Sequence, residues 1–191
     1  MDRAKSQIEK LEKEIFEKKK MISEILQTLP PIKIKNYELK QLDGTHTDLK
    51  HLFKDKTEMI IIHNMGKEFS YCTLWADGLR GLTHYINDRC AFILEMDKDI
   101  KEIAEFKEKR GWNFNVVSSQ GSTLKKDLGF EYENNGKVDY LPGFSTLFLD
   151  GDVIFCHTSS FFGPMDEYCS VWPLFDRLKK GINDWSPSFQ D

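Results

Sequence analysis

The stretch EMIIIHNMGKEFSYCTLWADG, residues 58–78, decides the fold class of this chain. Residues 58–65 run apolar instead of alternating with polar residues, which is typical of a strand buried on both faces of a sheet. A turn around Gly66 follows, and from Cys72 to Ile86 apolar residues return at helical spacing. A buried strand that leads directly into a helix predicts an α/β fold.

The same pattern continues further along the chain. Residues 90–96 and 114–119 are two more apolar segments of strand length, so we expect them to be buried strands. Residues 99–112 between them have helical spacing, with Asp99 at the position of an N-cap and Gly111 at the stop. The order strand, helix, strand, helix, strand predicts two βαβ units.

Shorter elements complete the domain at both ends. Residues 32–39 predict two short strands, and residues 144–159 predict a hairpin that turns at Asp150–Gly151. Residues 166–181 predict a closing helix. The whole order predicts a thioredoxin-like α/β domain, in which helices flank both faces of a mixed sheet.

The N-terminal segment is charged and has the periodicity of an amphipathic helix over residues 4–28. Pro30–Pro31 end it, because proline lacks the N–H that a helix needs. Two interpretations are open: the apolar stripe docks the helix on the domain, or it pairs with a second copy in a coiled-coil dimer. We therefore divide the chain into a helical extension, residues 1–29, and a thioredoxin-like domain, residues 30–191.

Composition excludes several classes of function. The 191 residues are 40% hydrophobic, which supplies a sizeable core for one domain with an appendage. The net charge is −4 without a large basic block, so we expect no nucleic-acid partner. No apolar run is long enough to span a bilayer, and the charged N-terminus is unlike a signal peptide. We expect a cytoplasmic protein that does not bind membranes.

The cysteines and histidines show no pattern of a metal site or a disulfide framework. The four cysteines are widely spaced along the chain: Cys72, Cys90, Cys156 and Cys169. Neither they nor the five histidines have close ligand spacing, so we expect no metal and no cofactor. Cys72 differs from the others because it follows a buried strand at the start of a helix, where free N–H groups favour a thiolate. For the other three we expect packing roles, although a pair between Cys72 and Cys156 or Cys169 stays open.

Three segments carry a family resemblance: YCTLWADGLRG (71–81), GWNFNVVSSQGS (111–122) and LPGFSTLFLDGDVIFCHT (141–158). They resemble a family of thioredoxin-like proteins known as a domain of unknown function. Its members typically carry a G-C-x-x-C-x-x-W-A-D-x-x-x-G motif and are often described as predicted dithiol-disulfide oxidoreductases. The resemblance covers nearly the whole chain, but Phe69 stands where the family has its first cysteine, and Cys72 matches the second.

The loss of the first cysteine leaves two interpretations of function. Dithiol exchange at this motif is impossible, because the attacking position is Phe69. In the first interpretation the protein is an enzyme, a thiol-dependent oxidoreductase or peroxidase that uses Cys72 alone and acts with a thiol or disulfide of a protein or peptide partner. In the second, Cys72 is a buried remnant packed under the helix, as free cysteine often is. The protein is then a redox-inactive module that binds a peptide or protein in the groove between residues Phe69, Ser70, Tyr71 and Cys72 on one side and Pro142 on the other.

Peroxiredoxins share the predicted fold, and the residue after their reactive cysteine is often threonine, as in Cys72–Thr73. Their signature also has a proline and a threonine ahead of the cysteine, whereas this chain has Phe69–Ser70–Tyr71. The peroxiredoxin signature is therefore absent. Pro142 lies near the position where thioredoxin-like proteins place a cis-proline that faces the active-site loop, and its isomer is open.

Three further side chains are candidates for the site. Trp75, three residues after Cys72, either shields the thiol or packs in the core. Asp77 is a candidate for the acid that assists proton transfer to the thiol, or it caps a turn or pairs with Arg80. His63 ends the first buried strand and either reaches the site or is a satisfied strand-end histidine.

Overall fold

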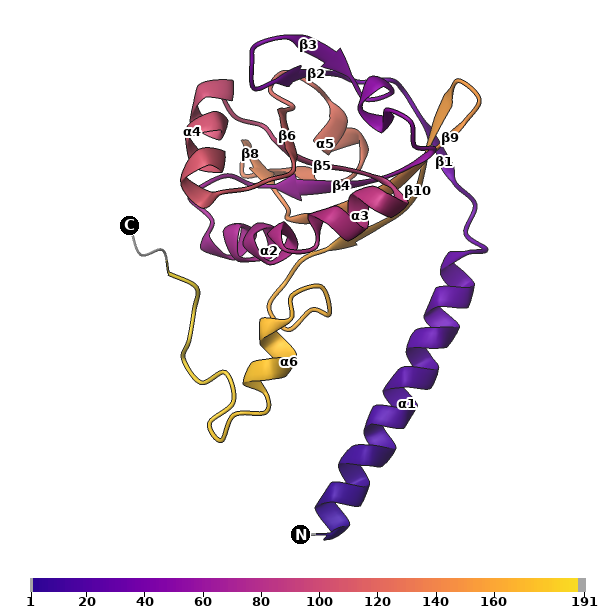
Figure 1. Ribbon diagram of the computed structural model, residues 1–191, viewed down its shortest axis with the longest axis vertical. Helices are drawn as coiled ribbons and strands as arrows, with labels where there is room; N and C mark the ends of the chain where they lie inside the picture. Colours follow the sequence, from indigo (N-terminus) through magenta and orange to yellow (C-terminus); the bar gives the residue numbers. More distant parts are fainter. Residues whose placement is uncertain (1, 189–191) are drawn as a thin grey trace.

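The computed structural model describes residues 2–188 and shows a mixed sheet between helices, with one long helix standing away from it (Figure 1). The strands are β1 (Ile32–Ile34), β2 (Glu38–Gln41), β3 (His46–Asp48), β4 (Glu58–Asn64), β5 (Ala91–Met96), β6 (Asn115–Ser118), β7 (Glu131–Asn134), β8 (Lys137–Tyr140), β9 (Gly143–Asp150) and β10 (Val153–Phe161). The helices are α1 (Asp2–Leu26), α2 (Ser70–Arg80), α3 (Thr83–Arg89), α4 (Ile100–Arg110), α5 (Leu124–Asp127) and α6 (Val171–Phe175), and a 3-10 turn, η1, spans His51–Phe53.

Eight strands form the main sheet in the order β1-β10-β9-β4-β5-β6-β2-β3. β4, β5 and β6 are parallel to one another, whereas β9 is antiparallel to β4 and β2 is antiparallel to β6. β7 and β8 form a separate hairpin. A parallel centre with antiparallel strands on both sides is the mixed sheet that the element order predicts.

The central strand β4 is buried on both faces, which explains its apolar sequence. Met59 and Ile61 pack in one core, beneath the β2–β3 hairpin and η1. Ile62 packs in a second core with Trp75 of α2 on the opposite face. Because β4 ends between these two cores, the loop that follows it starts from a rigid position.

Local signals set the boundaries of α4 as expected. The Asp99 side chain accepts a hydrogen bond from the Lys101 backbone N–H at 2.9 Å, which caps the start of the helix. Gly111 ends it with a φ of +63°, a left-handed conformation that suits glycine. The hairpin of β9 and β10 also turns where predicted, after Asp150.

The closing helix is shorter than the sequence predicts. α6 covers only Val171–Phe175, instead of residues 166–181. The Asp166 side chain accepts hydrogen bonds from the backbone N–H groups of Tyr168 and Cys169, at 2.8 and 3.1 Å. These bonds hold the chain in a turn, which competes with a helix for the same donors.

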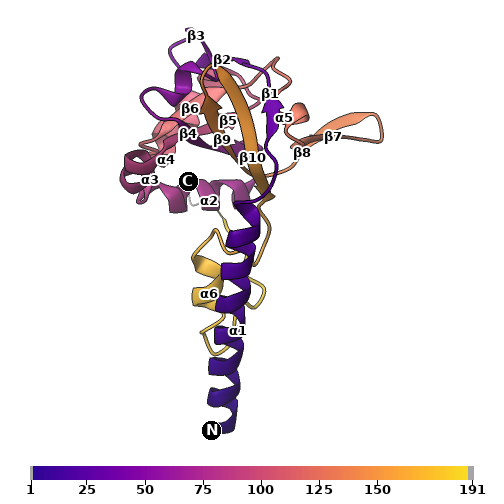
Figure 2. The same ribbon diagram turned by 90° about the vertical axis from the view of Figure 1, so that its right-hand side faces the viewer.

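The helix α1 projects from the domain and runs past the α6 segment (Figure 2). Its apolar stripe remains exposed, with Ile15 at 53%. Contacts with the domain are polar: Lys19 lies 2.6 Å from Glu167, and Arg177 pairs with Glu12. The expectation that the stripe docks on the domain is therefore wrong, while dimerisation through this helix stays a prediction.

Candidate functional site

Cys72 is the third residue of α2, which begins just after the loop that leaves β4. The thiol is 4% exposed, and burial raises its pKa. A hydrogen bond with the backbone of Met65 and the positive charge of Lys125 act in the opposite direction, but they do not outweigh burial. The desolvation of this site therefore exceeds the effect of the helix N-terminus, which favours a thiolate. Cys72 is buried, and its reactivity stays a prediction.

Phe69 and its neighbours form the exposed side of the same loop. Phe69 is the N-cap residue of α2 and is 40% exposed, and its carbonyl accepts from the Thr73 N–H at 3.2 Å. Ser70 and Tyr71 are half-buried. The Tyr71 ring lies 6.1 Å from the ring of Trp75. Two aromatic residues with exposed or half-buried side chains, Phe69 and Tyr71, thus lie in the chain just before the buried Cys72.

Pro142 lies beside the start of this loop. β9 pairs with β4 so that Gly143 is opposite His63, which leaves Pro142 just beyond the paired residues, at the end of β4 from which the loop starts. The peptide bond before Pro142 is trans. The Pro142 carbonyl accepts from the Phe162 N–H at 2.8 Å, so its acceptor is already used within the domain.

Trp75 and Asp77 have structural roles in the helix. Trp75 is 3% exposed and stacks on Phe162 in the core. Asp77 accepts from the Trp112 indole N–H at 2.8 Å and pairs with Arg110, instead of pairing with Arg80. Asp77 is five residues after Cys72, which turns it roughly 140° away around the helix. Its carboxylate therefore ties α2 to the end of α4.

A buried cluster of ionisable side chains, which the sequence analysis did not predict, lies next to the loop. His63 of β4 and Glu95 of β5 are register partners, and His63 Nδ1 lies 2.7 Å from Glu95 Oε1. Lys125 of α5 places its Nζ 2.9 Å from the same carboxylate oxygen. All three side chains are at most 2% exposed. We call them the His63–Glu95–Lys125 cluster.

The cluster is hydrogen-bonded to the loop that carries Cys72. Lys125 Nζ donates to the Asn64 carbonyl at 2.9 Å. The Asn64 side chain donates to the Cys72 carbonyl at 3.4 Å and accepts from the Gly66 N–H at 2.8 Å. Lys125 therefore holds the loop in place and also brings a positive charge near the thiol.

On its other side the cluster reaches the surface through two serines. His63 Nε2 lies 2.9 Å from the Ser145 hydroxyl, and this hydroxyl lies 2.8 Å from that of Ser159. Ser145 is completely buried, whereas Ser159 is exposed. A continuous chain of hydrogen bonds thus connects solvent at β10 with Glu95.

The ionisation of the cluster follows from these contacts. Burial alone would raise the pKa of the Glu95 carboxyl, but the Lys125 charge and hydrogen bonds from His63 and Ser119 outweigh it and lower this pKa to about 2. Burial lowers the pKa of His63 despite the attraction of Glu95. At neutral pH the imidazole is neutral; its Nδ1–H donates to the carboxylate and its Nε2 accepts from Ser145.

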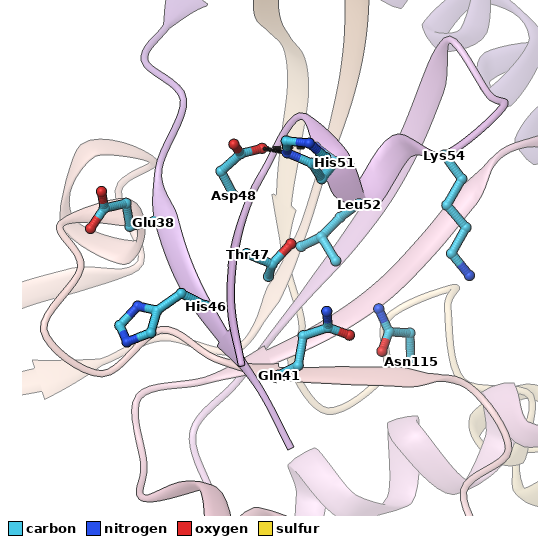
Figure 3. A pocket seen from close by; sticks show the side chains of 9 residues that line it. All are labelled: Glu38, Gln41, His46, Thr47, Asp48, His51, Leu52, Lys54 and Asn115. Carbon is cyan, nitrogen blue, oxygen red and sulfur yellow. Dashed lines mark hydrogen bonds and ion pairs between the residues drawn. The ribbon is translucent and has the colours of Figure 1, made fainter. Parts of the chain in front are cut away.

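A wide hollow of about 740 Å³ lies elsewhere, between β2, β3, η1 and β6 (Figure 3). Its wall includes Gln41, Lys54 and Asn115, and a hydrogen bond between His51 and Asp48 at 2.7 Å. Asn115 is the first residue of β6, so the hollow lies at the amino end of the parallel strands. The Cys72 loop lies at their carboxyl end, where ligands bind in open α/β sheets.

Two searches within residues 2–188 gave negative findings. No three or more histidine, cysteine or acidic side chains of this range gather as a set of metal ligands. None of the helices in this range combines the length and hydropathy of a membrane-spanning segment.

The comparisons with known proteins place the chain in a family. The family model named "Bacterial protein of unknown function (DUF899)" matches residues 2–189. The chain belongs to this family. A comparison with curated protein sequences gave no match. The resemblance to a family of unknown function is thus confirmed.

Solved structures support the fold of this DUF899 protein. Peroxidoxin BcpB of Mycobacterium tuberculosis has a TM-score of 0.53 and 20% identity, covering 64% of this chain and 79% of that chain. Peroxiredoxin Q of Xanthomonas campestris has a TM-score of 0.54 and 17% sequence identity, covering 65% of this chain and 78% of that chain. A mutant PrxQ of Xylella fastidiosa has a TM-score of 0.58 and 11% sequence identity, covering 70% of this chain and 83% of that chain. At these identities the likeness shows the fold, and the predicted thioredoxin-like α/β class is confirmed.

The remaining cysteines of the chain form no disulfide with Cys72. All four cysteines are free and buried. Cys156 belongs to the core beneath β2 and β3, and its Sγ lies 3.7 Å from the Ser159 hydroxyl. Cys169 packs in the opposite core with Trp75. The packing roles expected for Cys156 and Cys169 agree with these positions.

One signal in the sequence could have indicated the cluster. His63 and Glu95 interrupt the apolar runs of two strands that were already interpreted as buried. An ionisable side chain inside a buried strand needs a partner. Lys125 carried no such signal, because it lies in a polar segment whose short helix was not predicted.

Proposed function

We propose that this protein is a thiol-dependent redox protein in which Cys72 is the single reacting thiol. The observation that carries the proposal is the His63–Glu95–Lys125 cluster at the Cys72 loop. Burying an ion pair is often less favourable than apolar packing of the same volume, so such a pair is poorly explained by stability alone. Buried groups with shifted pKa values concentrate at functional sites.

The cluster supports two tasks in this chemistry. Lys125 favours the thiolate of Cys72 through its positive charge, against the effect of burial. Through Asn64 it also fixes the backbone at Cys72, which orients the sulfur. The proteins named as peroxiredoxins among the similar structures share this fold, which supports peroxidase-type chemistry as the form to test first.

The proposed reaction uses a hydroperoxide and two partner thiols. The Cys72 thiolate attacks the terminal peroxide oxygen, the O–O bond breaks, and the leaving oxygen takes up the proton that the thiol released, which leaves a sulfenic acid at Cys72. A partner thiol condenses with it, forming a mixed disulfide and water. A second partner thiol attacks the partner sulfur of this disulfide, which yields the partner's disulfide and restores the Cys72 thiol.

The experiment measures sulfenic acid formation at each cysteine. Folded protein is treated with hydrogen peroxide, trapped with dimedone and analysed by mass spectrometry from pH 6 to pH 10. We expect modification at Cys72 with a rate that rises with pH, because burial raises the pKa of this thiol. Lys125→Gln should slow the reaction at each pH, since it removes a charge that favours the thiolate. Its fold is checked by circular dichroism.

A matched control separates specific reactivity from general oxidation. Cys156 is also a buried thiol whose pKa is raised by burial, so Cys156→Ser should leave the Cys72 rate unchanged. Cys72→Ser should abolish the fast-reacting species. If Cys72 reacts only when urea unfolds the protein, the redox proposal is wrong.

The second candidate is a redox-inactive binding module. It is favoured by the 4% exposure of Cys72 together with the 40% exposure of Phe69, which places an aromatic side chain where the family has its attacking cysteine. Phe69→Cys tests whether the site geometry is retained. It should create activity in the reduction of insulin disulfides, and continued inactivity would mean that more than this residue has changed.

We also propose a reduced, cytoplasmic setting and a thiol or disulfide of a protein or peptide as the partner. The free state of all four cysteines supports a compartment that keeps thiols reduced.

A further inference from the structure

Two serine hydroxyls connect the buried His63 with the surface of β10, and the proposed redox chemistry does not use them. His63 Nε2 lies 2.9 Å from the Ser145 hydroxyl. The Ser145 hydroxyl in turn lies 2.8 Å from that of Ser159, its register partner on β10. Ser145 is completely buried, whereas Ser159 is exposed. The hydroxyl row therefore has one end in the core and the other in solvent.

The direction of each hydrogen bond in this row follows from the charge on Glu95. Its carboxylate is ionised at neutral pH and can only accept, so His63 Nδ1 carries the proton of the 2.7 Å contact between them. The neutral imidazole then has a lone pair at Nε2, which accepts from the Ser145 hydroxyl. A hydroxyl has a single proton, so Ser159 is the donor in its contact with Ser145. The proton of the exposed serine thus points inward, toward a base.

This arrangement is that of an activated nucleophile with one hydroxyl inserted. A weak nucleophile such as a serine hydroxyl is activated by an adjacent base, and a third group orients that base. His63 is the base and Glu95 orients it, while Ser145 passes the proton on, as a bridging water molecule can do. Ser145 is completely enclosed, so Ser159 is the hydroxyl of the row that a substrate can reach.

The surface around Ser159 suits a small ester with an aromatic group. Phe161 lies two residues further along β10, on the same face of the strand, and is 56% exposed. Its ring lies 5.2 Å from the ring of Phe130, which supports it from below. β1 pairs with β10 only as far as Cys156, and within residues 2–188 no other strand continues this pairing. Outward backbone N–H groups beyond Cys156 are therefore not used in the sheet and can donate to an oxyanion.

We propose that Ser159 is a nucleophile that accepts the acyl group of small aryl esters. Its Oγ attacks the ester carbonyl carbon, while its proton moves to Ser145 and the proton of Ser145 moves to His63 Nε2. The Glu95 carboxylate stabilises the imidazolium that forms. The tetrahedral intermediate expels the aryl oxygen, which takes the proton back along the row, and an acyl ester remains on Ser159. Attack by water along the same route releases the carboxylic acid and restores the serine.

The test is the reaction of the full chain with p-nitrophenyl acetate. Release of p-nitrophenol should begin with a burst of about one equivalent, and mass spectrometry should find the acetyl group on Ser159. Ser159→Ala should abolish the burst. Ser145→Ala keeps the Ser159 hydroxyl but interrupts the row, so acetylation should be slower by about 100-fold or more. Ser160→Ala is the matched control and should react normally, because Ser160 lies on the opposite face of β10, where it accepts from Tyr168 at 3.2 Å.

The pH profile distinguishes proton removal by His63 from the reaction of a merely exposed serine. Glu95 and Lys125 are the charged groups that face the imidazole, and burial lowers its pKa. The acetylation rate should therefore be constant above pH 7 and fall only below pH 6.5, whereas an unassisted hydroxyl reacts faster with every rise in pH. His63→Gln should be slow and should lose this plateau.

The proposal goes beyond the redox chemistry of Cys72 and does not depend on it. Cys72→Ser should be acetylated as the natural protein is, so the two proposals can fail separately. Circular dichroism checks the fold of each variant. The proposal is overturned if no burst occurs, or if the first acetyl group is found on a lysine or on Cys156, whose Sγ lies 3.7 Å from the Ser159 hydroxyl. It is equally overturned if Ser145→Ala reacts as fast as the natural protein, or if the rate rises steadily with pH.

Discussion

Lys125→Met would remove the positive charge of the buried cluster and leave the Glu95 carboxylate behind. The lowering of the Glu95 pKa from 4.5 to about 2 corresponds to about 3 kcal/mol of net favourable interaction with the ionised carboxylate. Lys125 is the largest contributor to that lowering. Removing one partner of a buried ion pair lowers stability by about 3–5 kcal/mol, so we expect a loss of about 3 kcal/mol or more at pH 7.

The assay is urea unfolding of the natural protein and of Lys125→Met from pH 3 to pH 8. In the natural protein the folded pKa of Glu95 lies below its unfolded value, so its contribution to stability is present above pH 4.5 and is lost as the pH falls toward 2. Without Lys125 the effect of burial is opposed by the interactions of Glu95 with His63 and Ser119, and the pKa of Glu95 rises. The loss of stability below pH 4.5 should therefore be shallower in the variant.

Two further variants decide whether the reasoning is correct. Adding Glu95→Gln to Lys125→Met removes the unpaired charge, and at least half of the lost stability should return. Lys50→Met is the matched control, because Lys50 pairs with Asp152 at the surface, where ion pairs contribute little. The reasoning is refuted if Lys125→Met is no worse than Lys50→Met, or if it keeps the natural dependence on pH.

Three other predictions can be checked independently. Gly143→Ala should lower the free energy of unfolding by about 3 kcal/mol, because a Cβ there would lie 2.2 Å from a backbone carbonyl oxygen of β10. Gly78→Ala, where a Cβ meets nothing within 4 Å, should raise the free energy of unfolding by about 0.5–1 kcal/mol. If urea unfolding shows Gly143→Ala to be the more stable of the two variants, this prediction is contradicted. The NMR titration midpoint of the His63 imidazole should lie below 6.5, because burial lowers its pKa. The free energy of unfolding should then fall below pH 6.5, as the unfolded chain takes up the proton, and an NMR midpoint at 6.5 or above would exclude this. Sedimentation equilibrium should show a dimer that Ile15→Glu in the stripe of α1 dissociates, whereas a monomeric natural protein at 50 μM would argue against pairing through this helix.

The parts of the fold that could be predicted are those governed by local or strongly periodic signals. β4 and β5 are mostly apolar, and α4 carries its own cap at Asp99 and its own stop at Gly111. The β7–β8 hairpin was not predicted, although its turn contains Asn135–Gly136, both with positive φ. This dipeptide is a strong hairpin signal, but the flanking segments are too polar to show the alternating hydrophobic pattern of strands.

Only part of the candidate site could be predicted from the sequence. The position of Cys72 at the start of a helix follows from the strand and the turn before it. The direction of its pKa does not, because burial results from packing between elements that are distant in the chain. Lys125 meets Glu95 only through the tertiary fold, so no spacing in the sequence could have paired them.

The contacts that hold α1 against the domain include ion pairs, so their strength depends on the salt concentration. Lys19 and Glu167, which help to hold the helix, are 55% and 52% exposed, so counter-ions reach both. The Debye length falls from about 10 Å in 0.1 M salt to about 3 Å in 1 M salt, which weakens such pairs. Apolar association through the stripe is not screened in this way. Raising the ionic strength therefore weakens the attachment of α1 to its own domain and leaves its apolar stripe free to associate with apolar surfaces.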